Sequence, residues 1–342
     1  MSLVLVAGGA GFLGSAVVRR LLGTGERVVL LDGFDDTGDG RAVKEERIAG
    51  FARHPRAAVV RGDAADPAFF ASVLALQRPS SIVNATLLPP DGPGLGPLLE
   101  SARGAGIGVF VHLSEGRLYG PRDEAQRRAR EDEAPEPGDD LDLRSKAAEE
   151  EALLASGVPF VNLRVFCAVG PDRGPARFPL DALEALFAGE EVALPDDAPR
   201  DFVHIEDVVR GILFAISRRP LGETVNLGSG LAVRPTELVR ALALRASREA
   251  RFSISGESSR PPRIADLERA WQLLGYSPQL GVNEIAWEIV RARLYPEEAG
   301  LAVRPARTPS RESADPSRPV SRRELFGLFR RPFDAAAKKR DG

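Results

Sequence analysis

Short apolar runs alternate along the chain with segments whose apolar residues recur at helical spacing. Six of these runs are expected to form strands: residues 2–7, 27–31, 57–61, 81–85, 109–113 and 160–166. Strands that are apolar throughout are typical of a parallel sheet buried on both faces, with helices as the crossover connections. The pattern therefore predicts an α/β protein with a doubly wound parallel sheet.

The second half of the chain is predicted to be mainly helical. Helices are expected at residues 141–155, 177–187, 205–217, 235–246, 267–274 and 282–294, with one strand at 252–255. Earlier helices are expected around 41–52 and, after a Pro/Gly-rich loop, at 97–103. The stretch 121–140 is crowded with prolines and charges, which predicts an exposed and mobile loop.

Gly8, Gly11 and Gly14 occupy the junction between the first predicted strand and the helix that follows it. Glycine allows a sharp turn there and lets the backbone approach a pyrophosphate, whose negative charge suits a helix N-terminus. An ordinary glycine-rich turn is the alternative, but the strand before and the helix after favour a dinucleotide site of the Rossmann type. The predicted cofactor-binding residues of this loop are Gly8, Gly11, Phe12, Leu13 and Gly14.

Two aspartates at the ends of later strands extend this candidate site. Asp32 ends the second strand about twenty residues beyond the loop, where a carboxylate binds the adenosine ribose hydroxyls. That carboxylate favours NAD over NADP, because it would repel a 2′-phosphate, and Arg41 lies too far along to count as a phosphate-binding residue. Asp63 follows the third strand, and it either accepts the adenine amino group or caps the helix that starts at Pro67.

Composition restricts the class of protein. With 342 residues, of which 43% are hydrophobic and 28% charged, the chain is long enough for a full α/β core with a smaller second lobe. The net charge of −3 argues against a nucleic-acid partner, and no metal site is expected. The single cysteine, Cys167, excludes an internal disulfide. We find no secretory signal and no membrane-spanning run, so a cytoplasmic protein is expected.

The composition changes from Leu301 onward. Residues 301–342 contain 11 Lys or Arg and 5 Asp or Glu, so this tail is net +6 and the rest of the chain net −9. Its five prolines predict disorder, and residues 321–333 within it form a short basic amphipathic segment. Such a segment is suited to docking on a membrane surface or on a protein, although an unattached solubilising tail would look the same.

Several short motifs, in order along the chain, resemble those of the extended short-chain dehydrogenase/reductases, specifically the NAD-dependent epimerase/dehydratases of nucleotide sugars. They are Gly8-Gly9-Ala10-Gly11-Phe12-Leu13-Gly14, Leu113-Ser114 with Tyr119-Gly120-Pro121, Leu163-Arg164-Val165-Phe166, Arg200-Asp201-Phe202-Val203-His204, Asn226-Leu227-Gly228-Ser229-Gly230 and Leu274-Gly275-Tyr276-Ser277-Pro278. The resemblance covers residues 1 to about 295.

This resemblance implies a Rossmann domain followed by a smaller substrate lobe. The Rossmann domain would comprise residues 1–168 and 202–228, and the substrate lobe residues 169–201 and 229–300, before the tail. It also implies a nucleotide-sugar ligand, whose phosphates the guanidinium groups of Arg200 and Arg260 would hold.

The chain departs from the family where the chemistry takes place. The family uses a tyrosine four residues before a lysine as its acid/base group, and here Asp142 precedes Lys146 by four. The resemblance gives Lys146 contact with the nicotinamide ribose. Asp142 is shorter than tyrosine, and an i,i+4 ion pair with Lys146 explains it better than catalysis does. Glu115 replaces the family's serine or threonine and would place a negative charge beside an anionic nucleotide sugar.

Other departures concern the phosphate contacts and the subunit interface. Cys167 replaces a phosphate-facing asparagine of the family and is expected to be a core residue. The segment between Ala85 and Val109 is short, so the helix that normally forms half of a dimer-forming four-helix bundle is reduced. The usual family dimer is therefore in doubt. His204 is expected to be structural, at a strand end before a helix cap.

Three hypotheses fit these residues. In the first, the chain is an NAD-binding protein with the epimerase fold but without Tyr-Lys chemistry, acting as a sensor, scaffold or partner subunit. In the second, it is an active NAD-dependent epimerase or reductase that uses Glu115 or Asp142 as its base. In the third, the basic tail makes it an adaptor, which is compatible with the first.

Overall fold

A computed structural model describes residues 2–35, 40–89, 92–120, 128–172, 178–256 and 263–295. The chain divides into two units, Met1–Arg304 and Pro305–Gly342, and all described residues lie in the first. Arg260 and the predicted docking segment 321–333 therefore lie outside the described residues.

Seven strands form one parallel sheet in the order β10-β6-β5-β4-β1-β2-β3. They are β1 (Leu3–Ala7), β2 (Arg27–Asp32), β3 (Ala57–Arg61), β4 (Ser81–Asn84), β5 (Val109–Glu115), β6 (Phe160–Val165) and β10 (Glu223–Leu227). The winding direction reverses between β1 and β4, which places the switch point of the sheet at the carboxyl end of β1. The prediction of a doubly wound Rossmann fold is confirmed.

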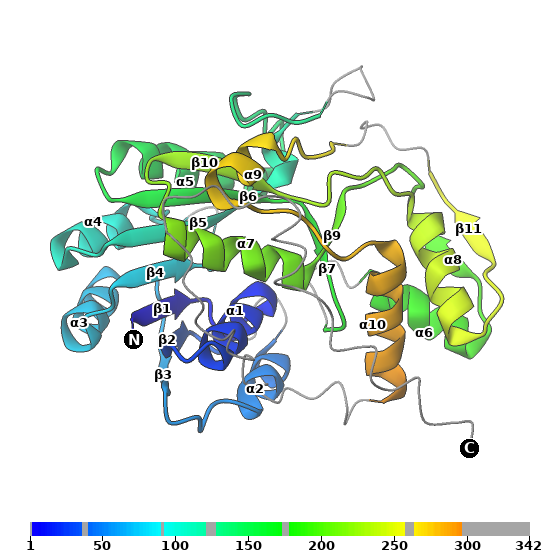
Figure 1. The fold of residues 1–342 in the computed structure, drawn as a ribbon, viewed down its shortest axis with the longest axis horizontal. Coiled ribbons are helices and arrows are strands. Elements are labelled where there is room, and N and C mark those ends of the chain that lie inside the picture. Colours follow the sequence, from blue (N-terminus) through cyan, green and yellow to red (C-terminus); the bar gives the residue numbers. More distant parts are fainter. Residues whose placement is uncertain are drawn as a thin grey trace, which may run out of the picture. The chain divides into compact units, whose positions relative to one another are not determined.

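Helices cover both faces of this sheet (Figure 1). One face packs against α1 (Phe12–Gly23), α2 (Arg41–Ala49), α7 (Ile205–Arg218) and α9 (Glu268–Leu274), and the other against α3 (Pro67–Gln77), α4 (Gly96–Ala105) and α5 (Leu141–Ala155). Val4 and Val6 of β1 enter the first core, whereas Leu5 and Ala7 enter the second. The central strands are buried on both faces, which is why they are largely apolar, whereas the edge strand β3 is only partly buried.

A smaller lobe has its own apolar core, formed mainly by α6 (Leu180–Ala188), α8 (Pro235–Ala246) and α10 (Val282–Leu294). Figure 1 shows these three helices together beside the sheet, beyond β7 (Cys167–Val169) and β9 (Phe202–His204). A further pair joins β8 (Val192–Leu194) to β11 (Phe252–Ile254). Of these short strands, the sequence predicted β11 and a strand end at His204, but it did not predict β7 or β8.

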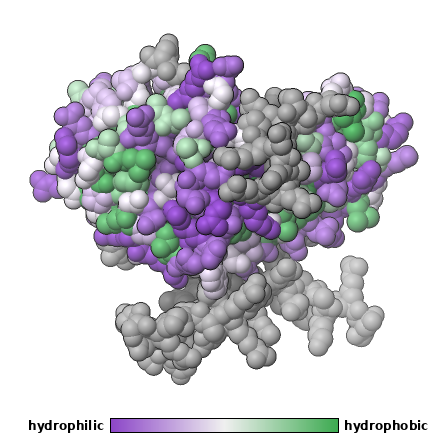
Figure 2. Space-filling model, turned by 90° about the horizontal axis from the view of Figure 1, so that it is seen from above, coloured by the Kyte–Doolittle hydropathy of each residue, from purple (hydrophilic) through white to green (hydrophobic). Residues whose placement is uncertain are grey.

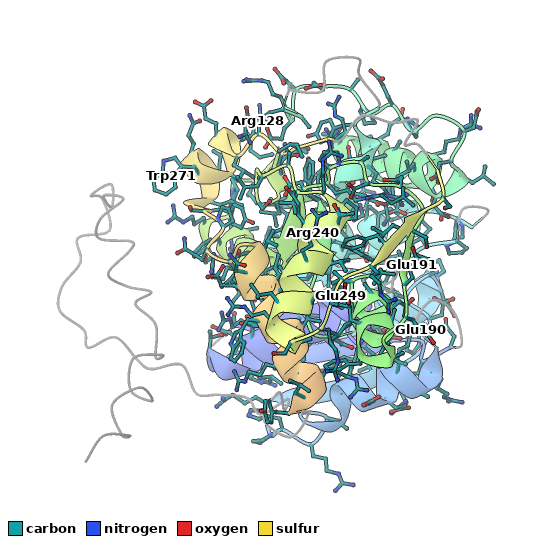
Figure 3. The ribbon with its side chains drawn as sticks, turned by 90° about the vertical axis from the view of Figure 1, so that its right-hand side faces the viewer. Arg128, Glu190, Glu191, Arg240, Glu249 and Trp271 are labelled. Carbon is teal, nitrogen blue, oxygen red and sulfur yellow. The ribbon has the colours of Figure 1, made fainter. Side chains whose placement is uncertain are left out.

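Residues 128–140 form a loop that is largely exposed, as predicted, but it is anchored to the body at a few positions; residues 121–127 lie outside the described ranges. Ala129 is fully buried and forms a parallel bridge with Ala265. The Glu133 carboxylate lies 3.0 Å from Arg263 Nη2. Arg128 donates to the carbonyl oxygen of Gly230 (2.8 Å), at the end of the unit away from the labelled Glu190 (Figure 3). Arg128 and Glu133 thus contact distant segments, whereas Asp132 and Asp139 are exposed and pair with nearby arginines.

Candidate functional site

The glycine loop lies at the switch point of the sheet. Gly8 has a φ of +73°, and a Cβ there would lie 2.5 Å from the Ala85 carbonyl oxygen. A Cβ on Gly14 would overlap the carbonyl oxygen of Gly8. Gly11 differs, because its φ of −70° suits any residue and the nearest atom to an added Cβ is Gly8 O, at 3.2 Å. Close packing requires glycine at positions 8 and 14, whereas at position 11 the fold could accommodate a larger residue.

Helix α1 starts without a side-chain cap. Its N-cap residue is Gly11, which makes no side-chain hydrogen bond to the first turn. The first N–H groups of a helix have no partner within it, and they carry the positive end of the helix dipole. An uncapped N-terminus beside a glycine loop therefore fits the pyrophosphate of a dinucleotide.

Asp32 is buried at the end of β2 and holds the loop in place. Its Oδ2 accepts a hydrogen bond from Ala10 N (3.0 Å), and its Oδ1 accepts one from Phe34 N (2.9 Å). Lys44 Nζ lies 3.4 Å from Asp32 Oδ1 and 2.6 Å from Asp35 Oδ1. A carboxylate offers about four acceptor positions, and with three groups already beside Asp32 one position is left for a ribose hydroxyl. Sequence reasoning missed Lys44, because one lysine on a highly charged helix gives no signal.

Asp63 is exposed after β3, and its Oδ1 accepts a hydrogen bond from Ala65 N at 2.8 Å. The cap of α3 is instead Asp66, which accepts hydrogen bonds from Ala68 N and Phe69 N. The alternative that Asp63 caps this helix is wrong, because Asp66 stands directly before Pro67. The contact of Asp63 with adenine stays a prediction.

On α5, Asp142 and Lys146 do not pair. Asp142 is exposed in the first turn, and its backbone N–H donates to the capping residue Asp140. Lys146 Nζ instead lies 2.8 Å from Glu149 Oε2. The predicted i,i+4 ion pair is therefore wrong. The reason is tertiary: the Glu149 carboxylate is buried, and charges attract more strongly away from water.

Glu115 closes β5 with about a third of its side chain exposed, at 32%. Arg117 pairs with it, through Nε and through Nη2, the latter 3.0 Å from Glu115 Oε2. Arg117 Nη1 also lies 3.6 Å from Asp140 Oδ2. The negative charge of Glu115, which was expected to oppose an anionic ligand, is thus largely offset by Arg117.

The three tyrosines of the chain lie on other elements than α5. Tyr119 is buried and donates its hydroxyl to Asn226 Oδ1 (2.7 Å), and buried Tyr276 donates to Gly228 O (2.9 Å). Burial raises the pKa of both phenols above the usual range. Tyr295 follows α10, in the smaller lobe. None of the three takes the place of the missing phenol at Asp142.

The remaining predicted residues lie where the lobe meets the sheet. Arg200 is partly exposed, and its Nη2 lies 2.8 Å from Asp196 Oδ2. Burial raises the pKa of the Cys167 thiol to about 11, which disfavours the thiolate and any nucleophilic role. His204 ends β9, as predicted, but it is itself the N-cap of α7 rather than the residue before the cap; its Nδ1 accepts a hydrogen bond from Glu206 N at 3.1 Å.

Metal and membrane features were sought in the described part of the chain. There, no group of three or more His, Cys, Asp or Glu side chains is arranged to hold a metal ion. None of the described helices combines the length and apolar character needed to cross a membrane. Figure 2 shows a face on which hydrophilic residues predominate among smaller apolar patches.

The sequence is similar to those of nucleotide-sugar epimerases and dehydratases. A family model described as the NAD dependent epimerase/dehydratase family matches residues 4–90 and 94–228. A UDP-glucose 4-epimerase of Lacticaseibacillus casei is 26% identical over 326 residues, covering 83% of this chain and 95% of that protein. A dTDP-glucose 4,6-dehydratase of Streptomyces griseus is 30% identical over 260 residues, covering 70% and 77%.

Solved structures agree in fold. The dTDP-glucose 4,6-dehydratase of Bacillus anthracis, in complex with NAD, has a TM-score of 0.79 at 20% identity and covers 87% of this chain and 98% of its own. The Bordetella bronchiseptica enzyme WbmH, in complex with NAD+, has a TM-score of 0.74 at 26% identity and covers 86% and 99%. Both of these solved structures contain NAD, which supports the prediction of NAD as the cofactor. The chain belongs to the NAD-dependent epimerase/dehydratase family.

Proposed function

We propose that the chain binds NAD and a nucleotide sugar but does not perform the Tyr-Lys chemistry of its family. The glycine loop around Gly11 would hold the pyrophosphate, Asp32 the adenosine ribose and Lys146 the nicotinamide ribose. Arg200 would face the phosphates of the nucleotide sugar. NAD, when bound, supplies a hydride acceptor, and the chain contributes binding and orientation.

One observation carries this proposal: Asp142, four residues before Lys146, is exposed, and neither buried tyrosine has a free hydroxyl to replace it. A phenol with a lowered pKa holds and passes a proton near neutral pH, whereas a carboxyl group is ordinarily ionised there and reaches less far. A protein that keeps the binding groups without this proton carrier suits a role as sensor, scaffold or partner subunit.

An active enzyme with rearranged groups is the second candidate, and Glu115 favours it. This carboxylate ends β5, and ligands of such sheets bind beyond the carboxyl ends of the strands. It is partly exposed, and Arg117 fixes its orientation. In this candidate Glu115 or Asp142 is the base.

Turnover separates the two candidates. We expect no conversion when the protein and NAD are incubated with UDP-, GDP- and dTDP-hexoses and the products are separated by chromatography. Asp142→Tyr is expected to introduce conversion, because it restores a phenol four residues before Lys146. Asp142→Phe is the matched control, since it supplies the ring without the hydroxyl.

Wild-type turnover at about 1 s⁻¹ or faster would overturn the non-catalytic proposal. Glu115→Gln and Asp142→Asn would then show which carboxylate is the base, by the loss of that turnover.

We further propose that the tail, residues 301–342, is a separate attachment element, because its net charge of +6 contrasts with −9 for the rest. Deleting it should leave NAD affinity and melting temperature unchanged while abolishing sedimentation with anionic vesicles. Replacing Leu325, Phe326, Leu328 and Phe329 by serine keeps the charge and tests the apolar part. Unchanged vesicle binding after deletion, or a large fall in melting temperature, would contradict the proposal.

A further inference from the structure

A buried row of polar side chains runs from β4 through β5 to α5. Lys146 Nζ lies 2.8 Å from Glu149 Oε2, which is also 3.4 Å from His112 Nε2. His112 Nδ1 lies 3.2 Å from Asn84 Nδ2, and Asn84 Oδ1 accepts a hydrogen bond from Thr86 Oγ1 at 2.7 Å. The Glu149 and His112 side chains are 1% and 0% exposed.

The hydrogen-bond donors and acceptors along this row can be assigned in only one way, starting from Thr86. Thr86 donates to Asn84 Oδ1, so the Asn84 amide nitrogen faces His112 Nδ1 and donates to it. Nδ1 is then the acceptor of a neutral imidazole, and the proton sits on Nε2, which faces Glu149. Burial, followed by the nearby charge of Lys146, lowers the pKa of His112 well below its usual value, in keeping with a neutral ring. Lys146 is therefore the hydrogen-bond donor to Glu149, and the neutral His112 ring packs beside it with Nε2 at 3.4 Å, without a hydrogen bond.

The pairing with Glu149 leaves Lys146 able to bind a ligand. An ammonium group has three protons, and Glu149 accepts one, so two are left for the hydroxyls of a ribose. The Lys146 side chain is 12% exposed, so the head group of this nearly buried lysine is held by its partner rather than by water. Glu150, the next residue, faces away to Arg164 and does not compete.

We propose that Glu149 is the positioning residue of the cofactor site: it fixes the Lys146 ammonium toward the nicotinamide ribose. This inference rests on the NAD binding proposed above. A role in stability alone accounts poorly for the row, because well-packed apolar side chains stabilise a core as well as a buried ion pair does, or better. Burial also raises the pKa of Glu149, an energetic cost that packing does not require.

Calorimetry with NAD and with ADP tests this proposal, because ADP has the adenosine half of the cofactor and lacks the nicotinamide ribose. Glu149→Met, which keeps the volume and removes the acceptor, should weaken NAD binding about tenfold, or 1.4 kcal/mol, and leave ADP binding unchanged. Lys146→Met should have the same effect, and the double variant should be no worse than either single one. Glu149→Gln keeps an acceptor for Lys146 and should restore most of the affinity.

Glu151→Gln is the matched control, since Glu151 is exposed on the same helix, and it should change neither affinity. Equal losses for NAD and ADP in Glu149→Met would mean general damage, and full NAD affinity in that variant would mean that Glu149 has no part; either result overturns the inference alone. Wild-type protein that binds neither NAD nor ADP would overturn the proposed function as well.

Discussion

Replacing Gly11 by valine is expected to weaken NAD binding by at least about a hundredfold while the protein stays folded. The backbone of Gly11 is extended, with φ −70° and ψ 176°, so it accepts a β-branched residue. An added Cβ meets only Gly8 O, at 3.2 Å. The rest of the side chain would occupy the space where a pyrophosphate approaches the N-terminus of α1. Calorimetry with NAD measures the loss, and the melting temperature without ligand reports on the fold.

Gly14→Ala is the informative contrast. A Cβ on Gly14 would overlap the Gly8 carbonyl oxygen and come within 2.9 Å of Gly9 Cα, so α1 would have to move away from the loop. This variant is expected to lower the melting temperature itself. Undiminished NAD affinity in Gly11→Val would refute the placement of the cofactor at this loop.

Truncating Glu150 is expected to cost about 3–5 kcal/mol of unfolding free energy, the largest single loss of stability that we predict. Glu150 accepts two hydrogen bonds from Arg164, from Nε at 3.0 Å and Nη2 at 2.7 Å, and a third from Ser114 Oγ at 2.6 Å. Both charged side chains are at most 5% exposed. Glu150→Ala would leave the Arg164 guanidinium buried without its counter-charge. Urea unfolding followed by circular dichroism measures the change.

Two further variants show whether the loss in Glu150→Ala comes from the unpaired Arg164 charge. Glu151→Ala changes an exposed neighbour on the same helix and should shift the unfolding free energy by less than about 0.5 kcal/mol. Glu150→Met with Arg164→Met removes both charges and should recover much of the loss, because no unpaired ion remains. A loss no larger in Glu150→Ala than in Glu151→Ala would show that the pair adds nothing to stability.

Local signals in the sequence predicted most of the sheet and the helices around it. The boundaries of α5, α8 and α10 agree with the predicted 141–155, 235–246 and 282–294. A strand that is buried on both faces is apolar along most of its length, so it can be recognised from its own residues alone. The same holds for the glycine loop, whose turn, strand and helix are contiguous.

The amino-acid sequence by itself thus determined the fold class, the family and the place of the glycine loop, since each depends on neighbours along the chain or on the order of motifs. Only the tertiary structure decided which charges meet. Lys146 pairs with Glu149 and not with Asp142, Glu115 is offset by Arg117, and Glu133 in the 128–140 loop pairs with Arg263. Burial strengthens some pairs over others, and burial is set by segments far away in the sequence.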